Sequence, residues 1–178
     1  MKAENYLKAF ISLVRSNKSR YGGYIVHIAI VLIAIGVVGS SVYDVETEAV
    51  LAPGESMTIN DYSLTYESLD WYGTPSKMVV TAEVSVYRGN RFISTLSPEV
   101  YFHPNFEQPV TEVAIRSTLI EDLYVILAGW EPVDSADLSK GYIAAFSAKV
   151  NPLVAWIWLG GGVFLLGGLL AFWPERRK

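Results

Sequence analysis

The sequence predicts a membrane protein in which two transmembrane helices flank a small antiparallel β barrel or sandwich domain outside the membrane. Three observations predict this fold class. Two long apolar stretches, residues 22–42 and 153–173, contain no Asp, Glu, Lys or Arg. Between them, residues 43–150 hold sixteen acidic and six basic residues, and turn signals separate short runs rich in β-branched and aromatic residues. Basic residues gather at both ends of the chain, outside the apolar stretches.

Residues 1–20 are predicted to form a basic amphipathic helix. Five basic residues stand against a single acidic one, Glu4, and apolar side chains recur at helical spacing from Ala3 to Val14. A segment of this kind before a membrane span is typical of an interfacial helix whose basic side chains lie among anionic lipid head groups. A helix packed on a partner protein is the alternative interpretation.

The first transmembrane helix is predicted over residues 21–42. The part from Tyr24 to Val42 would rise about 28 Å, close to the thickness of a bilayer core. It is longer than the apolar core of a cleaved signal peptide, which has about 7–15 residues. Because the basic residues precede it, its N-terminal end is expected in the cytoplasm.

Residues 43–150 are predicted to form an extracytoplasmic β domain. The clearest strand covers residues 79–87, where four small apolar side chains share one face and Gly89-Asn90 leads as a hairpin turn into residues 92–96. No helical pattern intervenes, which favours a barrel or sandwich. Further strands are predicted over residues 63–69, 110–115, 123–130 and 142–150.

The second transmembrane helix is predicted over residues 151–173, followed by a cytoplasmic tail at 174–178. Three terminal basic residues place its end in the cytoplasm, so both termini are expected there. Trp156, Trp158 and Trp173 fit the aromatic belts of the two interfaces. Glycines in this segment and small residues in the first one indicate close helix contact.

Several function classes are excluded by composition. The chain has no cysteine, so it forms no disulfide, Cys-ligated zinc site, iron–sulfur cluster or CxxC redox centre of its own. The sequence contains no phosphate-binding loop, nucleophile triad or basic nucleic-acid patch, so no nucleic acid is expected among its partners.

His27 is the one ionisable residue inside the first span, and an intramembrane titratable group is by default a functional-site hypothesis. Three interpretations compete: a neutral residue hydrogen-bonded within a helix bundle, a proton relay, or a metal ligand, with heme iron the leading metal. Chemistry alone favours the hydrogen bond. If iron here has two protein ligands, the second comes from another subunit, because the second span has no His or Met and His103 belongs to the external domain.

The sequence resembles the C-terminal part of the CcmF family, the membrane heme lyase of bacterial cytochrome c maturation. Four stretches, in order, are similar to that family and together extend over nearly the whole chain. They are Arg20-Tyr-Gly-Gly-Tyr-Ile-Val-His27 with the apolar run after it, Leu51-Ala-Pro-Gly-Glu-Ser56, Pro109–Thr118 with Glu121–Leu127, and Asn151-Pro-Leu-Val-Ala-Trp-Ile-Trp158.

The resemblance implies what the whole heme lyase does and what this chain contributes to it. The family takes heme from the heme chaperone CcmE and attaches it through thioether bonds to the Cys-x-x-Cys-His motif of apocytochrome c, which thiol-reducing proteins also handle. It holds a b-type heme in the membrane through two histidines on different helices, and His27 matches the second. Four residues match the family signature: Thr111, Glu112, Arg116 and Asp122. Two interpretations are open for them, docking of a partner protein and an ion network that holds the fold.

The chain departs from the family in lacking the tryptophan-rich external segment and the helix with the first membrane histidine. The resemblance therefore predicts the C-terminal product of a split gene, not catalytic alone, which works with a larger N-terminal CcmF subunit. Its catalytic residues are unknown. The rival hypothesis is a non-catalytic scaffold or assembly subunit of a respiratory complex that binds no heme.

Overall fold

The chain divides into two compact units in its computed structural model, residues 1–42 with 153–178 and residues 43–152. The structure describes residues 6, 8–9, 12–14, 16–104, 108–135, 137 and 141–173. Much of the predicted amphipathic helix over residues 1–20 lies outside the described residues. Lys18 and Arg20 belong to the first long helix instead.

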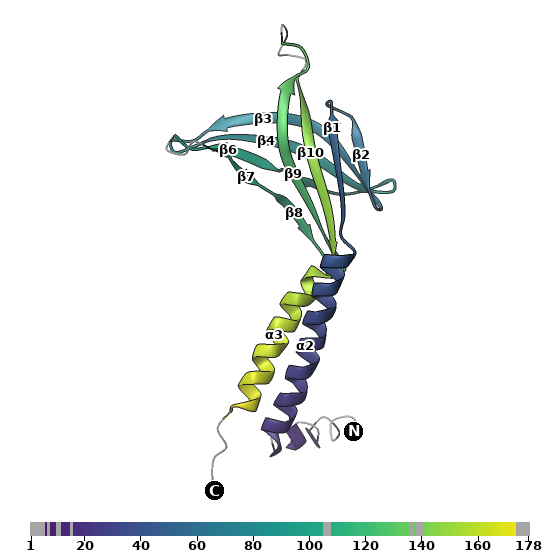
Figure 1. Cartoon of the computed structure of the whole chain (residues 1–178), viewed down its shortest axis with the longest axis vertical. Coiled ribbons are helices and arrows are strands. Elements are labelled where there is room, and N and C mark those ends of the chain that lie inside the picture. The colour runs from purple at the N-terminus through teal and green to yellow at the C-terminus, as the bar shows by residue number, and fades with distance from the viewer. Residues whose placement is uncertain are drawn as a thin grey trace. The chain divides into compact units, whose positions relative to one another are not determined.

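The first unit is built from two long helices, α2 at Lys18–Val42 and α3 at Val154–Ala171 (Figure 1). Both are long and apolar enough to cross a membrane, as the sequence predicted. Helix α2 begins three residues before the predicted span, because residues 18–20 already have helical backbone. Helix α3 ends two residues before Trp173, so that tryptophan follows the helix and is 60% exposed.

Glycines let α2 and α3 pack closely as an antiparallel pair. A Cβ atom added to Gly22 would lie 2.5 Å from the backbone nitrogen of Ala171, and one added to Gly36 would lie 2.7 Å from Cγ1 of Ile157. From the other side, a Cβ atom on Gly160 would lie 3.0 Å from the carbonyl oxygen of Ala29. Larger side chains at these positions would push the backbones apart, so the small residues define this interface.

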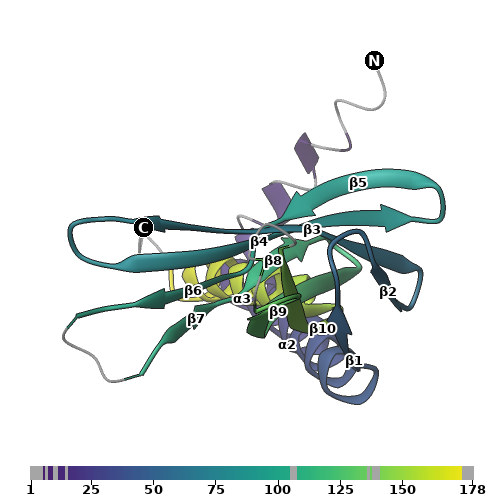
Figure 2. The same cartoon turned by 90° about the horizontal axis from the view of Figure 1, so that it is seen from above.

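The second unit is a β domain of two antiparallel sheets, as predicted (Figures 1 and 2). One sheet has the order β1-β10-β9-β8, and the other has the order β2-β3-β4-β6-β7 with β5 paired to β4. The strands are β1 Val45–Leu51, β2 Ser56–Ile59, β3 Tyr62–Gly73, β4 Met78–Arg88, β5 Arg91–Leu96, β6 Glu99–Phe102, β7 Val110–Glu112, β8 Ala114–Ser117, β9 Glu121–Pro132 and β10 Tyr142–Pro152.

The two sheets enclose one apolar core. The four residues predicted to share a face of β4 are all at most 3% exposed, and they face Leu123, Val125 and Leu127 of β9 within the core cluster. The hairpin turn occurs where predicted, because Gly89 adopts a φ of 58°, a left-handed conformation that glycine takes without steric cost.

The strands differ from the sequence prediction in two ways. The single strand expected over residues 110–115 is divided at Val113, because β7 pairs with β6 in one sheet and β8 pairs with β9 in the other. Strands β1, β2 and β6 were not predicted. Strands β2 and β6 have four residues each, too short for a clear alternating pattern.

Candidate functional site

The histidine of α2 has one ring nitrogen engaged and one available. His27 Nδ1 lies 2.8 Å from the carbonyl oxygen of Gly23, one helical turn earlier. A carbonyl oxygen only accepts, so Nδ1 carries the proton and donates it. In the neutral imidazole, Nε2 then carries the free lone pair, the arrangement in which histidine binds a metal.

His27 lies on the face of α2 opposite to the one that contacts α3. The contact face is marked by Gly22, Ala29 and Gly36, which follow one another at intervals of seven residues. At about 100° per residue, His27 is about 140° around the helix from Gly22. Its side chain is exposed in the described structure. Helix α3 therefore leaves the imidazole uncovered.

The surroundings of His27 on this face are apolar. Tyr24, Val31 and Val38, which lie one or more turns before and after it, are 50%, 57% and 54% exposed. Such a lining suits a flat, largely apolar porphyrin, and the imidazole supplies the donor that heme iron binds. No cluster of three or more His, Cys, Asp or Glu residues that could hold a bare metal ion occurs among the described residues. The imidazole of His27 is a donor of the kind that heme iron binds.

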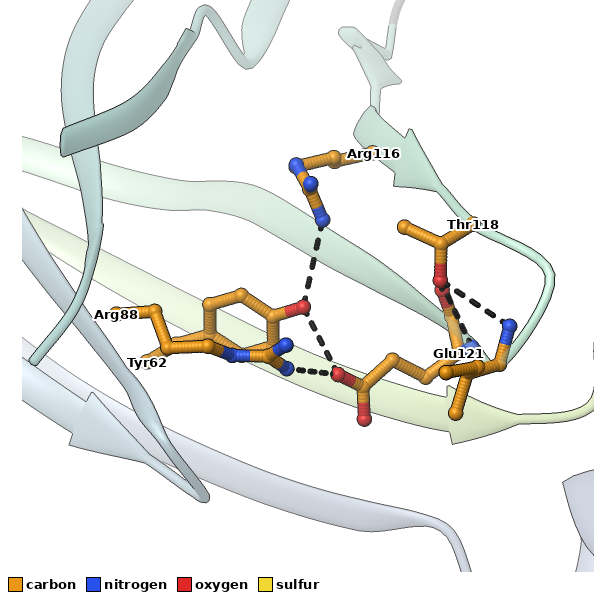
Figure 3. Close-up of polar contacts among 6 residues, drawn as sticks. Tyr62, Arg88, Arg116, Thr118 and Glu121 are labelled. Carbon is orange, nitrogen blue, oxygen red and sulfur yellow. Dashed lines mark hydrogen bonds and ion pairs between the residues drawn. The ribbon is translucent and has the colours of Figure 1, made fainter. Parts of the chain in front are cut away.

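A second polar site joins the two sheets of the β domain (Figure 3). The hydroxyl of Tyr62, on β3, donates to Oε1 of Glu121, on β9, at 2.9 Å. Arg88, at the end of β4, forms an ion pair with the same carboxylate, and its guanidinium lies 4.5 Å from the centroid of the Tyr62 ring. Arg116, on β8, donates from Nη1 to the Tyr62 hydroxyl at 3.4 Å. We call these four residues the inter-sheet cluster.

The members of the inter-sheet cluster are buried to different degrees. Tyr62 is 1% exposed, whereas the side chains of Glu121 and Arg88 are 17% and 47% exposed. Burial, followed by the hydrogen bond to Glu121, raises the pKa of the Tyr62 hydroxyl. The buried hydroxyl, and not the more exposed ion pair, is therefore the centre of the cluster.

The four signature residues named from the sequence do not form one site. Arg116 belongs to the inter-sheet cluster. Thr111 and Glu112 lie on β7 of the other sheet and are exposed, and Glu112 stands directly opposite Glu99 of β6. Asp122 is 5% exposed and accepts a hydrogen bond from the Tyr124 hydroxyl at 3.4 Å. The four residues thus occupy three different places: Thr111 and Glu112 are exposed on β7, Asp122 is buried, and Arg116 belongs to the inter-sheet cluster.

Sequence reasoning missed Tyr62 and Arg88 as members of the inter-sheet cluster. Tyr62 and Glu121 are 59 residues apart, and Arg88 and Glu121 are 33 apart, so no local spacing connects them. The available signal was weaker: a tyrosine directly after the Asn60-Asp61 turn, and an arginine directly before the Gly89-Asn90 turn. Only strand pairing, which places Tyr62 opposite Arg88, makes these two neighbours.

Comparison with known proteins shows which family the chain belongs to. A family model described as the CcmF C-terminal beta-sandwich matches residues 42–141. Cytochrome c-type biogenesis protein CcmF of Pseudomonas fluorescens is 35% identical over 172 residues, which are 97% of this chain and 24% of that protein. The probable cytochrome c-type biogenesis protein NrfE of Escherichia coli K12 is 28% identical over 167 residues, 94% of this chain and 29% of that protein.

The fold has a counterpart among solved structures. A structure titled cytochrome c heme lyase CcmF matches with a TM-score of 0.69 and 22% sequence identity, and the match covers 89% of this chain and 25% of that chain. At this identity, the likeness shows the fold alone. The chain thus spans about a quarter of the length of the relatives it matches.

Proposed function

The chain belongs to the CcmF family, and we propose that it is the C-terminal subunit of a split cytochrome c heme lyase, in which His27 is one axial ligand of a b-type heme held in the membrane. The observation that carries the proposal is the state of this imidazole. Its Nδ1 is bonded to Gly23, its Nε2 is available, and it lies on the face of α2 that α3 does not cover.

The chain's own residues prepare the ligand. The Gly23 carbonyl fixes the tautomer and the orientation of the ring, and a hydrogen bond of this kind makes the opposite nitrogen a better donor. The apolar side chains beside His27 would offer a porphyrin an apolar surface next to the imidazole. When bound, heme supplies one-electron chemistry, which the resemblance assigns to reduction of the incoming heme iron.

The rest of the site is proposed to come from a larger partner polypeptide. The relatives are about four times as long as this chain, so most of their length has no counterpart here. The partner would supply the second axial histidine and the tryptophan-rich segment, and the assembled complex would receive heme from CcmE and attach it to apocytochrome c. The β domain would contribute a docking surface, for which exposed Thr111 and Glu112 are candidates.

The proposed topology places both termini in the cytoplasm and the β domain outside. The basic residues before the first span and after the second support this orientation through the positive-inside rule. Because the chain has no native cysteine, a thiol reagent would label only a cysteine that is introduced by substitution. In intact cells, a membrane-impermeant thiol reagent should label Ser135→Cys and should leave Ser16→Cys unlabelled. The reverse pattern would show the opposite orientation.

The ligand assignment is tested by replacing His27 in the complex with its larger partner. Both His27→Ala and His27→Gln should assemble but lose the low-spin heme spectrum and cytochrome c maturation, because neither side chain replaces the imidazole. Exogenous imidazole should partly restore the alanine variant. His103→Ala, which changes the other histidine of the chain, is the matched control and should keep the spectrum.

The rival scaffold function makes the opposite prediction. A structural histidine in a helix bundle should tolerate Gln, because membrane hydrogen bonds contribute only about 0.6 kcal/mol on average. A His27→Gln complex with an unchanged heme spectrum and normal cytochrome c output would therefore refute the ligand assignment. A stoichiometric bis-histidine spectrum from the isolated, monomeric chain would refute the need for a partner ligand.

A further inference from the structure

The turn between β8 and β9 presents two large aliphatic side chains to the outside. Leu119 and Ile120 are 72% and 70% exposed. Tight turns are usually built from Gly, Pro, Asn, Asp or Ser, and two consecutive aliphatic residues at a turn tip bring no advantage in water. Neither residue belongs to the core cluster of the β domain. Their exposure is therefore a feature that folding of this domain does not explain.

The turn is held rigidly in this shape. Thr118 N donates to the Glu121 carbonyl oxygen at 3.0 Å, and the Thr118 hydroxyl donates to the same oxygen at 2.7 Å. The same hydroxyl accepts from the backbone nitrogens of Glu121 at 3.0 Å and Ile120 at 3.3 Å. Glu121 is in turn fixed by the inter-sheet cluster (Figure 3). The two aliphatic side chains are thus displayed by a preorganised support.

Strand register places this turn at the end of the sheet where the chain passes to its membrane helices. Glu121 pairs with Pro152, the last residue of β10, and α3 begins at Val154. On the other side of β10, Val45 pairs with Val150, and α2 ends at Val42. Adjacent strands lie about 4.8 Å apart, so the turn is one strand away from the point where the chain leaves the sheet.

The same end of the sheet carries a third exposed apolar residue. Tyr43, two residues before the start of β1, is 67% exposed. Tyrosine is enriched where proteins meet the membrane–water interface. The opposite end of the sheet differs, since the described part of the turn after β9 contains Asp134, Ser135 and Asp137. The tip of the turn nearest, along the chain, to both membrane helices is therefore aliphatic, whereas the described tip of the turn after β9 is polar.

We propose that Leu119 and Ile120 insert into the membrane interface and anchor the β domain to the lipid surface at a third point, beside its two covalent connections. The proposal rests on the membrane topology proposed above. An aliphatic turn at this place would gain by leaving water for the boundary between head groups and acyl chains. With two flanking helices and one lipid-bound turn, the domain would be held at a defined tilt, so that its docking surface faces one direction.

The test uses the full chain, reconstituted in phosphatidylcholine vesicles with a single environment-sensitive fluorophore. Leu119→Cys carries the probe, and Ser135→Cys at the other end of the sheet is the matched control. The twelve residues of β9 separate the two ends by roughly 36 Å. The Leu119 probe should emit at shorter wavelength, be quenched by lipids spin-labelled near the head group, and show several-fold weaker quenching by aqueous iodide than the control.

A second substitution tests whether the apolar side chains cause the insertion. Ile120→Glu should move the Leu119 probe into water, and Val133→Glu, an equivalent change at the other end of the sheet, should not. Equal iodide quenching of the Leu119 and Ser135 probes would overturn the proposal. A second result would also overturn it: shielding of the probe from iodide only in the complex with the larger partner, without quenching by the labelled lipids. A protein, and not lipid, would then cover the turn.

Failure of the topology would be visible separately. Lipid quenching of the Leu119 probe does not depend on which side of the membrane the β domain occupies, whereas labelling of Ser135→Cys by an impermeant reagent in intact cells does. Lipid quenching with inverted labelling would support the anchor and reject the orientation. Correct labelling without lipid quenching would reject the anchor and keep the orientation.

Discussion

Tyr62→Phe is the sharpest perturbation of the β domain, because it removes one buried oxygen atom and leaves the aromatic packing in place. The lost hydroxyl donates to Glu121 at 2.9 Å and accepts from Arg116 at 3.4 Å. A hydrogen bond to a charged group contributes about 1.5–3 kcal/mol, and the contact at 3.4 Å adds little. Because Glu121 remains 17% exposed and keeps Arg88, we expect the lower part of this range.

Arg88→Gln is the comparison that decides which contact dominates. Its ion pair with Glu121 involves a side chain that is 47% exposed, and such pairs contribute about 0–1 kcal/mol. The free energy of unfolding should therefore fall more for Tyr62→Phe than for Arg88→Gln. The two substitutions share a partner, so the double variant should show a measurable coupling free energy.

Amide hydrogen exchange of the full chain in mild detergent measures this difference locally. Peptides from β3 and β9 report the opening free energy of the two sheets, while peptides from α2 serve as an internal reference that should not change. A Tyr62→Phe variant whose β3 and β9 peptides lie within about 0.5 kcal/mol of the unsubstituted chain would refute the reasoning, since that is the range of ordinary surface changes.

Three further predictions concern other parts of the chain. Burial raises the pKa of Tyr66 to about 12, so between pH 10 and 12 the folded state keeps a proton that the unfolded state loses. The free energy of unfolding should therefore fall over this pH range, by at most about 2–3 kcal/mol. Urea titrations at several pH values should show that Tyr66→Phe reduces this pH dependence. Gly36→Leu should lower the melting temperature of the helix pair through overpacking of about 1–3 kcal/mol, whereas Gly161→Leu should not. Glu112→Lys should stabilise the β domain against urea by about 0.2–1 kcal/mol, because Glu112 stands directly opposite Glu99.

Controls separate these effects from general ones. Gly161 has no atom within 4 Å of an added Cβ, so an equal melting temperature loss at both glycines would contradict the packing argument. Glu83→Lys, on exposed β4 surface opposite Ser68, should leave stability nearly unchanged. If Glu112→Lys destabilised the domain, the like-charge argument would be wrong.

The parts of the fold that the sequence predicted are those in which one physical signal repeats over many residues. Helices α2 and α3 follow from uninterrupted apolar stretches, and β4 follows from alternation over nine residues. The division of residues 110–117 into β7 and β8 has no such signal. The sheet change at Val113 occurs without a glycine or proline to mark it.

The candidate sites were predictable to different degrees. His27 could be singled out from the sequence because it is the one imidazole in an apolar span, whereas its proposed role as a ligand came from the family resemblance. The inter-sheet cluster was not predictable as a unit. Its contacts join β3, β4, β8 and β9, and they exist only because register and sandwich packing bring those strand ends together.

The packing of the helix pair determines what can complete the site at His27. The glycine face of α2 is committed to α3 along the pair, from Gly22 at one end to Gly36 near the other. Helix α3 cannot also cover the imidazole, which lies about 140° away around α2. It has no His or Met to offer in any case. Under the proposed function, a second axial ligand would therefore approach from outside these two helices, against the face formed by Tyr24, His27 and Val31. Under the proposed function, the chain would thus provide one oriented ligand and an open face for the partner.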